Sequence, residues 1–520
     1  MLAVGSLSTA VLAQRPVTVA YQQTVLEIQQ NIQNGDLNRA SDLLARAFKT
    51  YPGDGGLDNL SGVIEIQEGH PGKARRAFAD AIRHSPKLVS AYLNLARLDM
   101  QTGEKDSALQ RETLQLYEKV LTIDPHNPEA KYQLPTLLMW MGRYQASLEA
   151  IHRLDAATRV QVQPLALVCA DEAALGHKEA ADRAAASLVA NQDLTEEDGM
   201  LIFPALRIAR RADLIETIFS VIASRRPLSA TGLRVWGLAQ EAQGKPQLAR
   251  VTLESAFSAS NLSPAPLVDL ARIAIAAKDY QNSLGYLAHA RAIAPNDASL
   301  PYEFGLVCFE MNLMGEARKA MGEALQLAPD NPEYNFGMGT VSSFAQDPME
   351  ALPYLTKYRS LRPDDPRGTL AMGVMYFRAK DFDSAKPWLT KATTIPKTAA
   401  EARYYLGSEL RQQKNYEQAL QELLMSARLK PDQASVIAET GAVYLALKNF
   451  PKADAYLHRA LDLDVNNYTA NFGLLQLYTR TADPRREEQS RRFNAVKDNN
   501  DQQYQEALRG IEARPETEIK

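Results

Sequence analysis

Residues 366–399 read PRGTLAMGVMYFRAKDFDSAKPWLTKATTIPKTA, and this stretch contains the pattern that decides the fold. The small residue Gly373 is followed by Ala385 and then by Leu389, which lies one helical turn further on. Pro396 comes next, and proline ends helices because it has no N–H and restricts the residue before it. The stretch therefore predicts two helices joined by a short turn and packed closely through Gly373 and Ala385.

The same pattern recurs along the chain with a constant period. Its glycines stand 34 residues apart, at Gly305, Gly339, Gly373, Gly407 and Gly441. The alanines of the second helix keep the same spacing, at Ala317, Ala351, Ala385, Ala419 and Ala453. The register also covers Ala40 and Ala74, weakens between about residues 153 and 262, and becomes regular again from residue 263. A fixed period of this length indicates a solenoid, in which each repeat contacts only its neighbours.

This period, the paired small residues and the Asp/Asn/Pro-rich turns resemble the tetratricopeptide repeat, a helix-turn-helix unit. The resemblance implies an all-α superhelix (solenoid) of stacked helix-turn-helix repeats, with about 13–14 units. The expected organisation is four N-terminal units in residues 14–152, degenerate helical repeats in 153–262, regular units with a C-terminal capping repeat in 263–500, and a polar tail in 501–520. We also predict a bend near residues 155–265, where the register is lost.

Residues 1–13, MLAVGSLSTAVLA, form a short apolar stretch that ends in small residues. This pattern is typical of a signal peptide, although no Lys or Arg precedes Arg15. We therefore expect export to a bacterial periplasm or secretion; the alternative is an apolar tail on a cytoplasmic protein. No apolar run reaches the ~18 residues of a membrane-spanning helix, so no membrane-spanning segment is expected.

Composition and charge disfavour several classes of function. The 520 residues include 58 Lys and Arg against 62 Asp and Glu, a net charge of −4, which disfavours a nucleic-acid binder. Cys169 and Cys308 are too few for a disulfide framework or a four-cysteine zinc site, and we expect both to be buried. No phosphate-binding loop, His-Glu-x-x-His or Gly-x-Ser-x-Gly motif occurs, and the histidines are scattered. We therefore predict no enzyme activity, no catalytic residue, no cofactor and no metal site.

In the family that the chain resembles, the first helix of each repeat lines a concave groove that binds partners. By register, the groove candidates are Tyr302, Phe309, Phe336, Phe344, Arg367, Leu370, Phe377, Arg378, Tyr404, Arg411 and Phe472. Aromatic and arginine side chains are the usual anchors of peptide-binding surfaces. The alternative, which the sequence leaves open, is that some of these residues pack between adjacent repeats.

One recognition mode of this family depends on particular residues. Members that bind the acidic C-termini of chaperones hold two carboxylates with Lys and Asn side chains on consecutive first helices. Here Asn94 matches one such position, but the neighbouring repeats have Asn59, Val63 and Glu129 at the others. The resemblance therefore disfavours an adaptor for chaperone tails.

The leading hypothesis for function is a non-catalytic scaffold that binds a peptide or protein partner in the groove. A second hypothesis is a periplasmic module of an export or envelope-assembly system that grips a polysaccharide, a glycan whose sugars would stack on the aromatic side chains. A third is a repeat-fused enzyme, which would need a catalytic domain of roughly 200 residues, and the repeats leave no room for one.

Overall fold

The computed structural model describes residues 19–102 and 107–497. The predicted signal peptide (1–13) and polar tail (501–520) lie outside these described residues. Throughout the described ranges the regular structure is helical and contains no strand. None of the described helices combines the length and the apolar character that crossing a bilayer requires.

The chain divides into two compact units, unit 1 up to Ala249 and unit 2 from Arg250. In unit 1 the helices are α1 (Val19–Gln33), α2 (Leu37–Thr50), α3 (Gly55–Gln67), α4 (Pro71–His84), α5 (Val89–Thr102), α6 (Ser107–Ile123), α7 (Pro128–Trp140), α8 (Tyr144–His152), α9 (Ala156–Arg159), α10 (Val162–Ala174), α11 (Lys178–Ala190), α12 (Glu196–Ile208), α13 (Ala212–Arg225) and α14 (Ala230–Ala242).

The boundary between the two units falls within α15 (Pro246–Ala259). Unit 2 continues with α16 (Ala265–Ala276), α17 (Tyr280–Ile293), α18 (Ser299–Glu310), α19 (Met314–Leu327), α20 (Pro332–Ser342), the short 3-10 helix η2 (Pro348–Ala351), α21 (Leu352–Leu361), α22 (Pro366–Arg378), α23 (Phe382–Thr393), α24 (Ala399–Gln412), α25 (Tyr416–Leu429), α26 (Ala434–Ala446), α27 (Phe450–Leu463) and α28 (Tyr468–Arg480). A further helical stretch covers residues 486–497.

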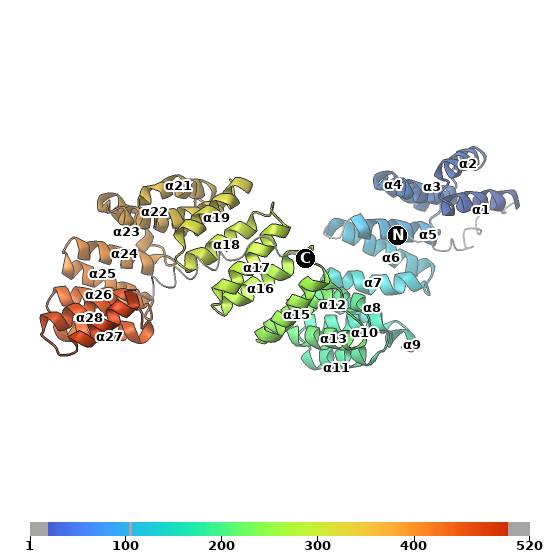
Figure 1. Cartoon of the computed structure of the whole chain (residues 1–520). Helices are drawn as coiled ribbons and strands as arrows, with labels where there is room; N and C mark the ends of the chain where they lie inside the picture. Colours follow the sequence, from blue (N-terminus) through green and yellow to red (C-terminus); the bar gives the residue numbers. More distant parts are fainter. Residues whose placement is uncertain (1–18, 103–106, 498–520) are drawn as a thin grey trace. The chain divides into compact units, whose positions relative to one another are not determined.

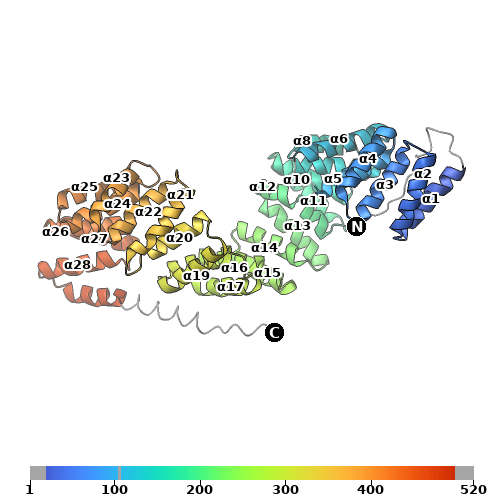
Figure 2. The same ribbon diagram turned by 90° about the horizontal axis from the view of Figure 1, so that it is seen from above.

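Within each unit, consecutive helices lie side by side in chain order (Figure 1; Figure 2). They form pairs, such as α22 with α23 and α24 with α25, which we call helix A and helix B of a repeat. In many repeats helix A also contacts helix A of the next repeat, as α22 contacts α24. The predicted all-α solenoid of stacked helix-turn-helix repeats is confirmed. The domain limits and the bend drawn from the sequence pattern stay predictions.

The glycines that mark the repeat allow helices A and B to approach closely. A Cβ atom on Gly373 would lie 2.7 Å from Leu389 Cδ2 and 3.1 Å from Leu389 N. The corresponding distances from Gly441 to the Cδ2 and N atoms of Leu457 are 2.8 and 3.2 Å. Contacts of 2.7 and 2.8 Å are almost never made by real Cβ atoms, so a larger residue at either position requires the facing leucine to shift. Leu389, rather than Ala385, supplies the side chain closest to Gly373.

The turn between helices A and B recurs in both units, including the stretch 153–262. It places one residue in the left-handed backbone conformation, at Gly142, Gly176, Arg210 and Gly244 in unit 1 and at Lys278, Asn312, Lys380, Lys414 and Lys448 in unit 2. Glycine adopts this conformation without steric cost, and other residues adopt it less readily. The turn positions keep the repeat spacing where the alanine and proline positions drift.

Both cysteines are buried and free on A helices, Cys169 on α10 and Cys308 on α18. The prediction that they are buried is confirmed. Burial raises the pKa of each thiol to about 12, which keeps both in the protonated, poorly nucleophilic form.

Candidate functional site

The A helices of unit 2 carry a continuous row of aromatic side chains. Tyr302 and Phe309 lie on one face of α18, since they are two turns apart. Tyr302 packs on Tyr334 of α20, with ring centroids 4.7 Å apart. At the other end of α18, Phe309 meets Phe344 edge to face, with a centroid distance of 5.2 Å. The register of helix A thus brings candidate residues from neighbouring repeats into contact.

The row continues across α22 and α24. Arg378 of α22 places its guanidinium 3.4 Å from the ring centroid of Phe344, an attractive cation–π arrangement. Phe377 meets Tyr405 of α24 edge to face, at a centroid distance of 5.4 Å. Tyr404 is half-buried beside Tyr405, and burial raises its pKa to about 12.

Two arginines of the predicted site hold successive A helices together. Arg367 forms a two-pronged ion pair with Glu333 of α20, with distances of 2.9 and 3.0 Å, and also bonds Asp365. Its hydrogen bonds hold the pKa of Asp365 at about 2. Arg411 of α24 pairs in the same way with Glu439 of α26, at 2.5 and 3.2 Å.

Exposure separates the candidates into two groups. Phe344 and Phe472 are 39% and 40% exposed, and Phe472 lies against Phe493 of the last helical stretch. The remaining aromatic candidates and Leu370 are half-buried. Phe336, for example, packs against Tyr358 of its own repeat and lies under Arg367. Packing between adjacent repeats, the alternative that the sequence left open, thus accounts for part of the set, and packing within a repeat accounts for Phe336. Contact with a partner stays a prediction.

Sequence reasoning missed Leu306 and Tyr405. Leu306 lies on α18 between Tyr302 and Phe309 and is 39% exposed. Tyr405 joins Phe377 to Tyr404. The signal for Leu306 was present in its spacing, since it stands one turn after Tyr302.

The A helices of unit 1 present polar side chains in the corresponding row. Arg97 on α5 forms a bidentate ion pair with Glu129 of α7. In this pair Arg97 Nε donates to Glu129 Oε1 at 2.7 Å, and Arg97 Nη2 donates to Glu129 Oε2. Arg97 Nη1 also donates to Asn94 Oδ1 at 3.0 Å, and Asn94 Nδ2 donates to Asn59 Oδ1 of α3 at 3.0 Å. Asn94, the residue that matches a carboxylate-clamp position, is therefore engaged with its neighbours, and Glu129 supplies a negative charge where a clamp needs a positive one.

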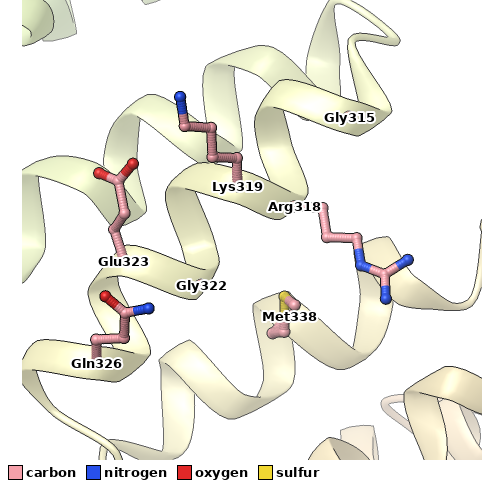
Figure 3. A pocket seen from close by; sticks show the side chains of 7 residues that line it. All are labelled: Gly315, Arg318, Lys319, Gly322, Glu323, Gln326 and Met338. Carbon is pink, nitrogen blue, oxygen red and sulfur yellow. The ribbon is translucent and has the colours of Figure 1, made fainter.

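An open depression runs along helix B of one repeat, where two glycines of α19 leave space (Figure 3). It is lined by Gly315, Arg318, Lys319, Gly322, Glu323, Gln326 and Met338. Arg318 is paired with Glu350 and Glu323 with Arg291. Because these ion pairs neutralise much of the charge at its rim, the depression offers little to a charged ligand.

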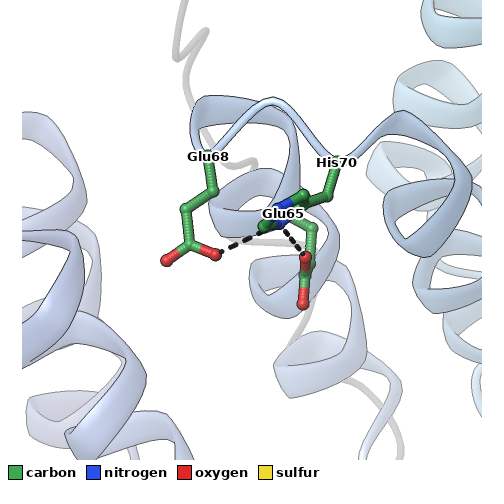
Figure 4. Close-up of side chains that lie close together, drawn as sticks. All are labelled: Glu65, Glu68 and His70. Carbon is green, nitrogen blue, oxygen red and sulfur yellow. Dashed lines mark hydrogen bonds and ion pairs between the residues drawn. The ribbon is translucent and has the colours of Figure 1, made fainter.

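Glu65, Glu68 and His70 form one cluster of potential metal ligands at the end of α3 (Figure 4). One ligand atom from each residue lies within 4.8 Å of the other two. His70 Nδ1 lies 3.0 Å from Glu65 and 3.6 Å from Glu68, and Lys73 Nζ lies 3.6 Å from Glu65. The cluster is largely exposed, and the hydrogen bond between His70 and Glu65 together with the Lys73–Glu65 ion pair accounts for its geometry without a metal.

Comparison with known proteins gives one family and several structures. The family described as tetratricopeptide repeat matches residues 111–168, which extend from α6 into α10. No curated protein sequence matches the chain.

Three solved structures are similar to parts of the chain. The APC/C hetero-tetramer Cut9-Hcn1 shows 15% identity and a TM-score of 0.40, over 87% of this chain and 95% of the other. A tetratricopeptide repeat protein from Parabacteroides merdae shows 17% identity and a TM-score of 0.37, over 46% and 93% of the two chains. MamA from Desulfovibrio magneticus RS-1 shows 18% identity and a TM-score of 0.31, over 32% and 95%.

The family match covers one part of unit 1, and the paired helices with their recurring left-handed turn extend through both units. The match to the tetratricopeptide repeat family is thus confined to residues 111–168, while the described residues of both units share the architecture of stacked helix pairs.

Proposed function

We propose that this chain is a non-catalytic interaction scaffold that binds a peptide or protein partner on the A-helix face of unit 2. We use this name for the row of side chains on α18, α20, α22 and α24 and in the turn after α20, which includes Tyr302, Leu306, Phe344, Phe377 and Tyr404. The observation that carries the proposal is the exposure of Leu306 and Phe344, at 39% each, within this row. Large apolar side chains that stay exposed among ordered rings are available to a partner.

The surrounding geometry favours recognition over simple packing. The half-buried rings around Phe344 are held in place by Phe309 and Arg378, so they lose little conformational entropy when a partner binds. Arg367 and Arg378 lie at the edge of the row, and aromatic and arginine residues are enriched among the anchors of protein interfaces. The stacked A helices extend this surface over several repeats, which suits an extended peptide.

The test is a pull-down from a lysate of the source organism with the full chain as bait, comparing two double variants. Leu306→Ala with Phe344→Ala removes the two exposed anchors. Leu327→Ala with Met425→Ala removes two side chains of similar exposure, 44% and 45%, on the B helices α19 and α25. We expect the first variant to weaken binding of a retained partner by about 30-fold, the loss of roughly 2 kcal/mol typical of an anchor. Equal retention by both variants would contradict the proposal.

A second candidate is a polysaccharide-binding module of an export or envelope-assembly system. Tyr468 and Phe472 favour it, because they are 52% and 40% exposed and their rings stack nearly parallel, at an interplanar angle of 25°. Such a ring face could stack against a sugar. Retention of glycan by the bait, lost on changing Tyr468 and Phe472 to Ala but kept in the Leu306/Phe344 variant, would favour this candidate.

Export is also part of the proposal, on the pattern of residues 1–13. We expect the protein to be recovered from the periplasm or the medium with an N-terminus at Gln14, the residue after Ala13. N-terminal sequencing of the native protein checks this. An intact Met1 on protein recovered with the cytoplasm would count against a periplasmic or secreted location.

A further inference from the structure

A small pocket lies on the A-helix side of the first repeats of unit 1. Its walls include Val25 of α1, Gly56 and Leu60 of α3, and Leu88, which precedes α5. The pocket has a volume of about 20 Å³, slightly more than the roughly 10–15 Å³ that one water-sized group requires. It therefore admits a group about the size of a carbonyl oxygen or a methyl.

Two buried polar atoms belong to residues that line this pocket. Asn59 is fully buried, and its Nδ2 atom has no hydrogen-bond acceptor among the described residues. The buried hydroxyl of Ser90 likewise has no partner there. A buried donor without an acceptor costs about 1–3 kcal/mol, so a ligand that supplies the acceptor recovers that energy.

The hydrogen-bond network determines which atom of Asn59 is left over. Arg97 has only donors, so the atom of Asn94 that it contacts must be the Oδ1 acceptor. Asn94 Nδ2 therefore points to Asn59 and must meet its Oδ1. The amide orientation of Asn59 follows in turn, and its Nδ2 is the group that remains without a partner.

Charge around the pocket excludes an ionic ligand. No Lys or Arg lines it, and Tyr21, which does, donates its hydroxyl to Asp54 at 2.8 Å. An anion would be repelled by Asp54 and would lack a counter-charge. A cation would find the N–H donor of Asn59 where it needs an acceptor. The pocket therefore suits a single neutral hydrogen-bond acceptor, such as a carbonyl oxygen.

We propose that this pocket binds the carbonyl oxygen of one peptide group of an extended partner segment, and that this oxygen accepts a hydrogen bond from Asn59 Nδ2. The N–H of the same peptide group, or of its neighbour, matches the acceptor capacity of the Ser90 hydroxyl. The choice of a peptide as ligand rests on the proposed scaffold function. The site itself lies in unit 1 and is separate from the A-helix face of unit 2.

The test uses the full chain with ¹⁵N-labelled asparagine and the probe N-acetyl-alanine-methylamide, the smallest molecule with two peptide groups and one methyl side chain. Asn59→Asp assigns the side-chain amide signal of Asn59 by its loss. This variant keeps an oxygen to accept from Asn94 but replaces the free donor with an acceptor. We expect a saturable shift of the Asn59 signal in the wild type, while the amide of Asn335, which donates to Pro329 O and Asn331 O, stays unchanged.

Ser90→Ala provides a second variant that removes one hydroxyl and no other contact in the network. We expect it to weaken probe binding by about 2- to 10-fold, the loss of one net hydrogen bond. Three outcomes would overturn the proposal: no shift at Asn59, as for a site that holds only a structural water; equal shifts at Asn59 and Asn335; or unchanged binding in Ser90→Ala. The pull-down with the Leu306/Phe344 variant tests the A-helix face of unit 2, whereas the probe titration tests the pocket in unit 1. Either proposal can therefore fail while the other holds.

Discussion

Gly441→Ala is expected to lower the free energy of unfolding of unit 2 by about 1–3 kcal/mol, whereas Gly322→Ala is expected to raise it by about 0.5–1 kcal/mol. Both glycines lie inside helices, α26 and α19. A Cβ on Gly441 would lie 2.8 Å from Leu457 Cγ and 3.2 Å from Leu457 N, so helices α26 and α27 would have to separate. A Cβ on Gly322 would meet nothing within 4 Å.

The opposite signs make this pair of variants a sharp test of the packing. At Gly322 alanine only reduces the conformational freedom of the unfolded chain, which stabilises a helix. At Gly441 the same gain is outweighed by the clash with Leu457. Urea unfolding followed by circular dichroism gives the two midpoints, and hydrogen exchange shows whether the loss is confined to α26 and α27. Shifts of equal sign at the two positions would show that the close approach of helices A and B is not what requires glycine.

Asp171 is expected to make the stability of unit 1 depend on pH. It is fully buried on α10, and neither carboxylate oxygen has a partner with hydrogen-bond geometry among the described residues. Burial raises its pKa to about 7, and the nearby Ser147 opposes this only in part because its hydroxyl donates to Pro135 O at 3.0 Å. Glu172, next in sequence, adds a negative charge that raises the pKa further.

The direction of the effect follows from the raised pKa. The protonated carboxyl is favoured in the folded state, so its contribution is fully present below the unfolded pKa of 3.8 and is lost as the pH rises through about 7. Between pH 5 and pH 8 the wild type should lose roughly 2–3 kcal/mol of stability through this residue.

Asp171→Asn, which is always neutral and nearly the same size, is the matched control for this pH effect. We expect the variant to be less dependent on pH than the wild type and more stable than it at pH 8, in urea titrations at pH 5 and pH 8. The difference between the two proteins removes the contribution of the groups that they share. Parallel pH profiles of the wild type and the variant would show that Asp171 titrates at an ordinary pKa.

Most of the fold was predictable from the sequence because a repeat is specified locally. Gly373, Ala385, Leu389 and Pro396 lie within one period, and they set where each helix begins, ends and packs. The stretch 153–262 was harder to interpret because alanine and proline positions drift there. The turn residues Gly142, Gly176 and Gly244 are separated by whole repeat periods. Aligning the sequence on these glycines would have identified the repeats in this part of the chain.

The candidate site was predictable only as a set of positions. Register placed Phe344 and Tyr404 on A helices, but Phe344 lies in the turn after α20, and register did not distinguish its exposed ring from the half-buried ring of Tyr404. That difference depends on the neighbouring repeat, since Tyr404 packs beside Tyr405, whereas Phe344 is contacted mainly by Phe309 and Arg378 and stays 39% exposed. The sequence likewise could not predict that Asn59 Nδ2 lacks an acceptor, because this follows from contacts among helices α3, α5 and α7.

The sequence by itself determined that this protein is an array of paired helices, because the small residues, turns and helix ends that make one repeat are neighbours along the chain. Only the tertiary structure decided which side chains of that array are available to a ligand. Arg367 and Glu333 stand one period apart, and the stacking of their A helices is what converts two charged surface positions into an ion pair. Exposure and hydrogen-bond satisfaction are properties of adjacent repeats, and they are established only when the repeats pack together.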